Sequence, residues 1–124
     1  MQFDIKDGKP GSERLRWATY KNDNGDELRV RLYIPDSAKW SRYLARFKVG
    51  TAKYDPAAAI RYISQHWFTE FEGAKDADGN DLQNTPTIRA LMMYQDKAFF
   101  VWVQNCIGEF QDEEEEGNED SGTD

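Results

Sequence analysis

Residues 55–71, with the sequence DPAAAIRYISQHWFTEF, decide the fold that the chain is expected to adopt. Asp55 can accept a hydrogen bond from a free backbone N–H, and Pro56 suits the first helical position, so a helix is predicted to begin here. Apolar residues then recur every three or four positions and share one inner face: Ala59, Ile60, Ile63, Trp67 and Phe71. Because Gly73 follows, we expect one central helix over residues 55–71, on which the other elements pack.

Two segments before this helix alternate between apolar and polar residues, as strands with one buried face do. In residues 14–20, RLRWATY, the alternation predicts that one set of side chains faces inward: Leu15, Trp17 and Thr19. In residues 28–34, LRVRLYI, it predicts the same of another set: Leu28, Val30, Leu32 and Ile34. Between the segments, Asn24-Gly25 readily accepts the positive φ of a tight turn, so the two strands should form a hairpin.

Three further helices are expected. One runs to Val49 from a cap at Asp36 or Ser37, and a short one over residues 85–94 starts with a Thr-Pro pair and turns three side chains inward: Ile88, Leu91 and Met92. Asp96 can cap a final helix with a second apolar stripe: Phe99, Trp102, Val103, Cys106, Ile107 and Phe110. The predicted fold class is α+β, an N-terminal β-hairpin followed by about four helices packed on the central helix.

The charge of the chain is concentrated at its C-terminal end. The 124 residues carry a formal net charge of −7; of the 23 acids, eight lie in residues 111–124, which hold no base, so residues 1–110 keep fifteen acids against sixteen bases. A nearly neutral body argues against general nucleic-acid binding, which needs clustered bases. The alternating arginines fit a solvated strand face: Arg14, Arg16, Arg29 and Arg31. We expect a loose segment over residues 1–12, one domain over 13–110 and a disordered acidic tail over 111–124, or a tail in which a few residues continue the last helix.

Compartment and membrane binding follow from what the sequence lacks. No stretch approaches the ~20 apolar residues of a membrane span, and no charged leader with an apolar run precedes the domain. Cys106 is the only cysteine, which excludes an internal disulfide. We therefore expect a cytoplasmic protein that does not bind membranes.

Patterns typical of catalytic, cofactor or metal sites are missing from the sequence. His66 is the only histidine, and no nucleophile or acid lies at a motif spacing from it, so a structural or surface role is the simpler interpretation. Cys106 falls in an apolar stripe, where cysteine commonly acts as a small hydrophobe. Residues 76–81, DADGND, resemble a calcium loop, but the glycine is fourth rather than sixth and Thr87 stands where a bidentate Glu is needed. No enzyme activity, cofactor or metal is therefore expected.

Two features leave alternatives open. Several aromatic residues of the central helix spread over more than one narrow face: Tyr62, Trp67, Phe68 and Phe71. Either they pack in a core on two sides, which the pattern favours, or some of them form an exposed patch. The acidic tail is a solubilising segment, a decoy for a nucleic-acid-binding protein, or a flexible element that contacts a basic partner.

The layout of the chain resembles the tail assembly chaperones of long-tailed bacteriophages. The likeness covers residues 14–110 and rests on a strand hairpin followed in order by IPDSAKWSRYLARF (34–47), DPAAAIRYISQHWFTEFEG (55–73), the turn DADG (76–79) with Leu82, and TPTIRALMMYQDKAFFVWVQNCIGEF (85–110). In that family a Trp and a Gly close the central helix, a polar turn follows, and a two-helix segment with aromatics ends the domain before a charged tail. The matching positions here are Trp67, Gly73, Asp78-Gly79 and residues 99–102, although five residues separate the Trp from the Gly, more than is usual.

The resemblance implies a non-enzymatic helper of virion assembly. Such proteins bind the long, largely helical tape-measure protein, keep it soluble, and leave as tail-tube subunits polymerise around it. They act in the host cell cytoplasm and are absent from the mature virion, and a longer frameshifted product is thought to connect the complex to the tail-tube subunit. Groove packing against an apolar helix makes Trp67, Phe68 and Phe71 the expected partner-binding residues.

Other functions are compatible with the same sequence. The eight tail acids and the low pI fit an acidic nucleic-acid-mimicking inhibitor, which would be expected to bind a basic protein in a salt-dependent way. A structural tail-completion component is a further alternative. Self-association through a hairpin edge or an aromatic patch is compatible with each of them.

Overall fold

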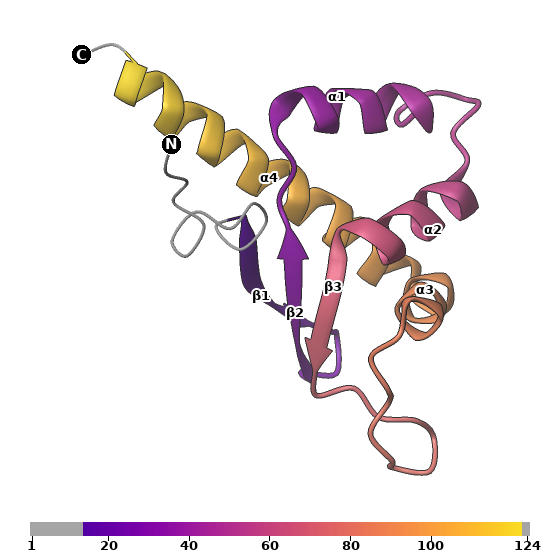
Figure 1. The fold of residues 1–124 in the computed structure, drawn as a ribbon. Coiled ribbons are helices and arrows are strands. Elements are labelled where there is room, and N and C mark those ends of the chain that lie inside the picture. Colours follow the sequence, from indigo (N-terminus) through magenta and orange to yellow (C-terminus); the bar gives the residue numbers. More distant parts are fainter. Residues whose placement is uncertain (1–13, 123–124) are drawn as a thin grey trace, which may run out of the picture.

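The computed structural model describes the backbone of residues 14–122 and the side chains of residues 14–114. Within this part the chain is α+β, as expected, with a three-stranded antiparallel sheet and four helices (Figure 1). The elements follow one another as β1 (Leu15–Lys21), β2 (Glu27–Tyr33), α1 (Ser37–Arg46), α2 (Pro56–His66), β3 (Phe68–Glu72), α3 (Pro86–Gln95) and α4 (Lys97–Gly122). The segment over residues 1–12, predicted to be loose, lies outside the described residues.

The sheet has the strand order β1-β2-β3, so β2 is its central strand. The turn that joins β1 to β2 is closed by Asn22, whose side-chain oxygen accepts hydrogen bonds from the N–H groups of Asn24 and Asp26 at 3.0 and 2.9 Å. Gly25 lies in this turn at φ 87°, a conformation that glycine adopts without a steric penalty. The turn therefore forms where the Asn-Gly pair predicted it.

The sequence predicted the wrong buried face for β1. Trp17 is 36% exposed and lies under the guanidinium of Arg29, whose Cζ is 4.6 Å from the ring centroid. Tyr20 faces inward instead, and its ring centroid lies 5.1 Å from that of Phe99 and 5.2 Å from that of Trp102. Because both faces of the strand carry an aromatic ring, alternation alone could not decide between them, and the packing of Tyr20 against α4 does.

The central helix ends at His66 and not at Phe71, because the residues after Trp67 form β3. β3 pairs antiparallel with β2, with Val30 opposite Phe71 and Leu32 opposite Phe68. This register leaves one more residue on β3 than on β2, which is a β-bulge. The bulge brings Phe68 and Phe71 to the same inner face although they are three positions apart. In the sequence that spacing is typical of a helix, so the strand was missed.

All four helices begin at the predicted capping positions. In each case a side-chain oxygen accepts a hydrogen bond from a backbone N–H in the first turn, which satisfies a donor that the helix itself cannot pair. The four pairs are Asp36 with Lys39, Asp55 with Ala58, Thr85 with Ile88, and Asp96 with Phe99. No helix within residues 14–122 is both long and apolar enough to cross a membrane.

The core lies between the sheet and the helices that surround it. α4 crosses behind one face of the sheet, and α2 and α3 lie beside β3 (Figure 1). α1 lies beyond the end of β2 and contacts α4. Gly108 of α4 lets the indole of Trp40 on α1 approach closely, since a Cβ at this glycine would lie 3.0 Å from Trp40 Cζ2. The side chains that are fully excluded from solvent come from the sheet, α2 and α4, and from the loop after β2: Val30, Leu32, Ile34, Ala59, Ile63, Phe68, Val103 and Ile107.

α4 continues beyond the point where the sequence predicted disorder. The prediction ended the folded domain at Phe110, whereas the helix runs to Gly122. The first turn of the acidic segment belongs to the domain, because Gln111 is buried and Glu114 forms ion pairs with Arg14 at 2.8 Å and with Arg16 at 3.4 Å. These cations offset the repulsion between the neighbouring acids of this turn. The remaining two residues, 123–124, lie outside the described part.

Candidate partner-binding site

The three residues that the sequence nominated for partner binding lie in the core. Trp67 is 3% exposed, Phe68 is 0% exposed and Phe71 is 8% exposed. The Trp67 ring packs 4.8 Å from that of Tyr43, and the Phe68 ring packs 5.8 Å from that of Phe99. Of the two alternatives for these aromatics, the structure shows core packing, so a partner cannot reach them without opening the domain.

An apolar groove lies elsewhere, between the N-terminal part of α2, the end of α3 and the first half of α4. We call it the α2–α3–α4 groove; it has a volume of about 440 Å³. Its lining residues are Tyr54, Pro56, Ala57, Ile60, Met93, Tyr94, Lys97, Phe100, Val101 and Gln104. Tyr94 and Val101 are the exposed large hydrophobic side chains among them, at 46% and 43%. Exposed apolar side chains that border a concave apolar surface are typical of a binding site.

Short local features of the sequence shape this groove. Pro56 and Ala57 start α2 with small side chains, which leaves room beside them. At the other wall, Asp96 breaks the chain between α3 and α4 in an extended conformation, with φ −128° and ψ 96°. Tyr94 connects the two walls, because its hydroxyl donates a hydrogen bond to the carbonyl oxygen of Ala57 at 3.1 Å. The groove is therefore held open by backbone geometry and by one hydrogen bond between α3 and α2.

A shared amide oxygen stands behind the groove. Gln104 Oε1 accepts hydrogen bonds from the hydroxyls of Tyr43 at 2.6 Å and Tyr54 at 3.1 Å. Burial raises the pKa of Tyr43 and, less strongly, that of Tyr54, for which the bond to Gln104 acts in the opposite direction. Both hydroxyls are therefore neutral donors at physiological pH, and the amide joins α1, the loop before α2, and α4.

Sequence reasoning missed the groove although a signal was present. Residues 99–103, FFVWV, are apolar at five consecutive positions, which is more than one helical face can bury. Val101 is the member of this run that the fold leaves exposed. The predicted inner face of α3 was also partly wrong, because Leu91 is 44% exposed while Met93 is 1% exposed. Which side chains of α3 face inward depends on where α2 packs, and the periodicity of α3 does not show this.

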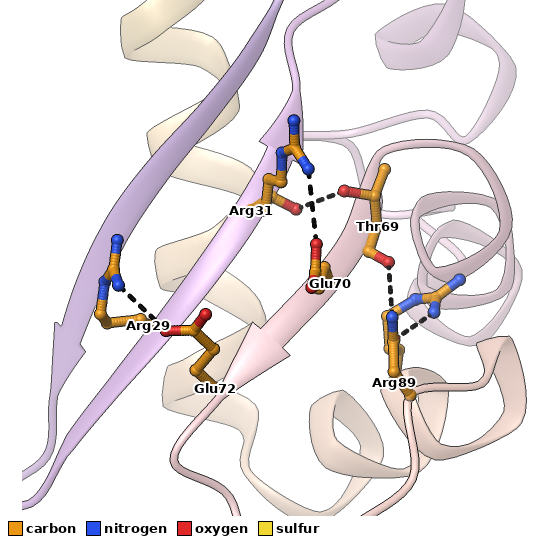
Figure 2. A network of polar contacts seen from close by, with 7 residues as sticks. Arg29, Arg31, Thr69, Glu70, Glu72 and Arg89 are labelled. Atoms are coloured by element: carbon orange, nitrogen blue, oxygen red, sulfur yellow. Dashed lines mark hydrogen bonds and ion pairs between the residues drawn. The ribbon is translucent and has the colours of Figure 1, made fainter. Parts of the chain in front are cut away.

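The outer face of the sheet is polar and paired. Figure 2 shows Arg29 and Arg31 of β2 beside two acids of β3, with 2.9 Å between Arg29 Nη1 and Glu72 Oε2 and 3.5 Å between Arg31 Nη1 and Glu70 Oε2. Thr69 donates its hydroxyl to the Arg31 carbonyl at 2.9 Å. Arg29 and Arg31 form the solvated strand face that was predicted, and cross-strand acids balance their charge. Exposed pairs of this kind contribute about 0–1 kcal/mol each, so this face is a paired surface rather than a vacant cationic site. Arg14 and Arg16 do not belong to this face, because they pair with Glu114 of α4, and the Arg16 guanidinium carbon lies 5.1 Å from the Phe110 ring centroid.

Arg89 is a buried cation with a structural role. It is 7% exposed, and its Nε and Nη2 donate to the Ser64 carbonyl oxygen at 3.2 and 3.0 Å. Its Nη1 donates to the Asn84 side chain, which in turn donates to the Thr69 carbonyl at 3.2 Å, as Figure 2 shows in part. A cation that binds a carbonyl in the last turn of a helix also complements the helix dipole. Arg89 therefore joins α3 to the end of α2, and burial lowers its pKa.

The residues weighed for chemistry occupy ordinary structural positions. His66 is exposed, and its ring lies 4.6 Å from that of Tyr62. Burial raises the pKa of Cys106 to about 11, so its thiol is protonated and weakly nucleophilic at neutral pH. In the turn after β3, Asp76 Oδ1 accepts hydrogen bonds from the N–H groups of Asp78 and Asn80, both at 2.9 Å. Within the described chain, no three His, Cys, Asp or Glu side chains lie together as a metal site.

Comparisons with known proteins add no relative. The chain matches no protein-family model, no curated protein and no solved structure. A function is therefore argued from the geometry of the described residues, beginning with the α2–α3–α4 groove.

Proposed function

We propose that the protein is a non-enzymatic bacteriophage tail assembly chaperone, which binds the tape-measure protein and keeps it soluble during tail-tube assembly. The observation that carries the proposal is the α2–α3–α4 groove, with the exposed side chains of Tyr94 and Val101 at its walls. The layout of residues 14–110 supplies the identity of the partner by resemblance. The residues proposed to touch the partner are those of the groove and not Trp67, Phe68 and Phe71.

The chemistry of the groove suits the apolar face of a helix. Its floor is formed by Ile60, Met93 and Phe100, and each apolar side chain that a partner buried there would contribute on the order of 2 kcal/mol. A helix places such anchors at i, i+3 or i+4, and i+7. Lys97 stands at the rim and can pair with an acid on the partner helix. A largely helical protein that needs protection from aggregation offers faces of this kind.

The likeness to the family departs from its layout between Trp67 and Gly73. The family places Gly soon after the Trp that closes the central helix, whereas here five residues lie between Trp67 and Gly73. Those residues form β3, the third strand of the sheet. β3 is an edge strand of the sheet and supplies no residue of the α2–α3–α4 groove.

Co-expression with the candidate tape-measure protein of the same locus tests the proposal. The wild-type protein is expected to raise the soluble fraction of the tape-measure protein and to co-elute with it on size exclusion. Val101→Asp places a charge on the groove wall and is expected to abolish both effects. Trp17→Asp is the matched control, since Trp17 is a comparably exposed apolar residue on the outer sheet face, next to Arg29 and Arg31, which can pair with the new acid.

The outcomes distinguish a failure of the proposed chaperone function from a failure of the proposed binding site. A wild-type protein that neither solubilises nor co-elutes with the tape-measure protein contradicts the chaperone function. Wild-type binding that Val101→Asp leaves intact contradicts the groove alone. Circular dichroism and urea midpoints of all three proteins show whether a lost complex reflects a lost surface or a lost fold.

The two alternative functions predict different results. An acidic inhibitor requires its tail, so removal of residues 115–124 would abolish binding to its target; this truncation spares Glu114, which is held by Arg14 and Arg16. The chaperone is expected to keep its partner after the same truncation. A tail-completion component would be found in purified virions, from which the chaperone is expected to be absent.

A further inference from the structure

We propose that the basic surface of α1 binds the acidic C-terminal segment of a second copy of this chain. The surface is separate from the α2–α3–α4 groove, and the proposal does not depend on the proposed function. Its starting point is a segregation of charge along the chain. Residues 37–54 hold five bases and no acid, whereas residues 115–124 hold five acids and no base.

The bases of α1 surround a concave surface. We call it the α1 hollow; it has a volume of about 480 Å³ and is lined by Lys39, Arg42, Tyr43, Arg46, Phe47 and Tyr62. The three bases are exposed and are spaced at i, i+3 and i+7, so they share one face of the helix. Tyr43 and Phe47 are buried and form the floor. The Arg46 guanidinium carbon lies 5.2 Å from the Phe47 ring centroid, which holds this base at the rim of the hollow.

These bases are not neutralised within the described chain. The ion pairs among the described residues use Arg14, Arg16, Arg29, Arg31 and Lys75, and none uses a base of α1. Asp36, the acid nearest in sequence, accepts the backbone N–H of Lys39 as the helix cap. The α1 hollow therefore presents three cations to solvent, and a ligand with several carboxylates would match them.

The acidic segment of the same chain points away from this hollow. Glu114 is bound by Arg14 and Arg16 at β1, and from there α4 extends outward past the sheet, away from α1 (Figure 1). A molecule with its cationic surface and its acidic segment on different sides cannot pair the two within one copy, whereas contact with other copies pairs both. Such a contact joins unlike surfaces, so it is heterologous and can propagate from copy to copy.

The same bases could meet the phosphates of a nucleic acid, but the observations favour an acidic peptide. The whole chain carries a net charge of −7, which repels a polyanion from a surface with only a few bases. Of the three aromatic rings that line the hollow, Tyr43 and Phe47 are buried and Tyr62 is half-buried against them, with 5.9 and 5.4 Å between ring centroids, so little aromatic surface is left for a base to stack on. The acidic peptide that is present at the same concentration as the hollow is the C-terminal segment of this protein.

Two full-length variants and their mixture test the proposal by sedimentation velocity at low salt. The first removes the α1 cations: Lys39→Gln, Arg42→Gln and Arg46→Gln. The second removes tail acids beyond Glu114: Glu115→Gln, Glu116→Gln, Glu119→Gln and Asp120→Asn. A control removes three exposed bases elsewhere on the chain: Lys21→Gln, Arg61→Gln and Lys75→Gln. Wild type and control are expected to associate as concentration rises, and loss of three exposed ion pairs should weaken association by roughly 5- to 100-fold in either variant.

The mixture of the α1 variant and the tail variant gives the most specific prediction. Each variant keeps the half that the other lacks, so equal amounts of the two should form a complex that stops at one copy of each. This complex should dissociate as salt rises from 50 to 500 mM, because the Debye length falls several-fold over that order of ionic strength.

Three results would overturn the proposal. The first is a wild type that stays monomeric at low salt, and the second is a pair of variants that associate as the wild type does. The third is a mixture that forms no complex, because the tail would then bind its own chain. A labelled single-stranded oligonucleotide provides the last comparison. If the wild type binds it, the α1 variant does not, and self-association is equal in both, the hollow is a nucleic-acid site instead.

Discussion

Replacing Phe68 by alanine should destabilise the domain strongly. Phe68 is 0% exposed, lies opposite Leu32 in the sheet, and packs its ring 6.1 Å from that of Phe71 and 5.8 Å from that of Phe99. Truncation of a fully buried Phe costs about 3–5 kcal/mol, which is the lost transfer free energy together with the cavity that remains. The folding equilibrium constant should fall by roughly a hundred- to several thousand-fold.

Urea unfolding followed by tryptophan fluorescence measures this cost, since the chain has four tryptophans. With a slope of about 1–3 kcal/mol per molar urea, the midpoint should fall by about 1–5 M at an unchanged slope. Phe68→Leu retains most of the side-chain volume and should cost about 1–2 kcal/mol. Leu91→Ala is the control, because Leu91 is 44% exposed and its loss should change stability by no more than ~0.5 kcal/mol.

The alternative view of Phe68 gives the opposite result. If its ring were on the surface as a contact for a partner, Phe68→Ala would cost less than ~1 kcal/mol and would remove binding from a stably folded protein. That outcome would refute both the bulged register of β3 and the assignment of the core.

Three further predictions follow from single contacts. Gln104→Leu removes the shared acceptor of the Tyr43 and Tyr54 hydroxyls and should cost about 2–4 kcal/mol in urea titrations; a cost near zero would mean that water replaces the amide. Stability should fall between about pH 9 and 11, because the folded chain holds the Cys106 thiol proton up to a pKa of about 11 and the unfolded chain releases it earlier. Cys106→Ala should flatten that part of the curve, and an unchanged slope would contradict burial of the thiol. Gly73→Ala should lower the free energy of unfolding by about 1–2 kcal/mol, because Gly73 has φ 96°; an unchanged urea midpoint would contradict this turn geometry.

Local chemistry allowed the helix starts and the first turn to be predicted. Each of the four caps depends on one polar side chain and on the free N–H groups just after it, so neighbouring residues contain all the information. The Asn-Gly turn is a local signal for the same reason. These features are correct because no distant segment is needed to form them.

The predictions were wrong where contacts between segments distant in the sequence determine the structure. The spacing of Phe68 and Phe71 matches a helix as well as a bulged strand, and only pairing with β2 distinguishes the two. The face of β1 depends on α4, against which Tyr20 packs. The continuation of α4 past Phe110 depends on Arg14 and Arg16, which lie at the other end of the chain and bind Glu114.

The residues nominated for partner binding lie in the core for a related reason. A large aromatic side chain is a good binding contact and an equally good core residue, and the sequence does not show which neighbours cover it. Trp67, Phe68 and Phe71 are covered by α1, α4 and the sheet. Tyr94 and Val101 belong to helices whose inner faces are already filled, so they are the side chains that remain exposed beside the α2–α3–α4 groove.

Calorimetric titration of the purified protein with the tape-measure protein, or with a helical segment of it, tests the central claim most directly. We expect saturable binding with a negative heat-capacity change, the mark of apolar burial. Val101→Asp should weaken it at least tenfold, and Trp17→Asp should leave it unchanged. Binding that is equal in all three proteins, or no binding by the wild type, would contradict the claim that this groove holds the apolar face of that partner.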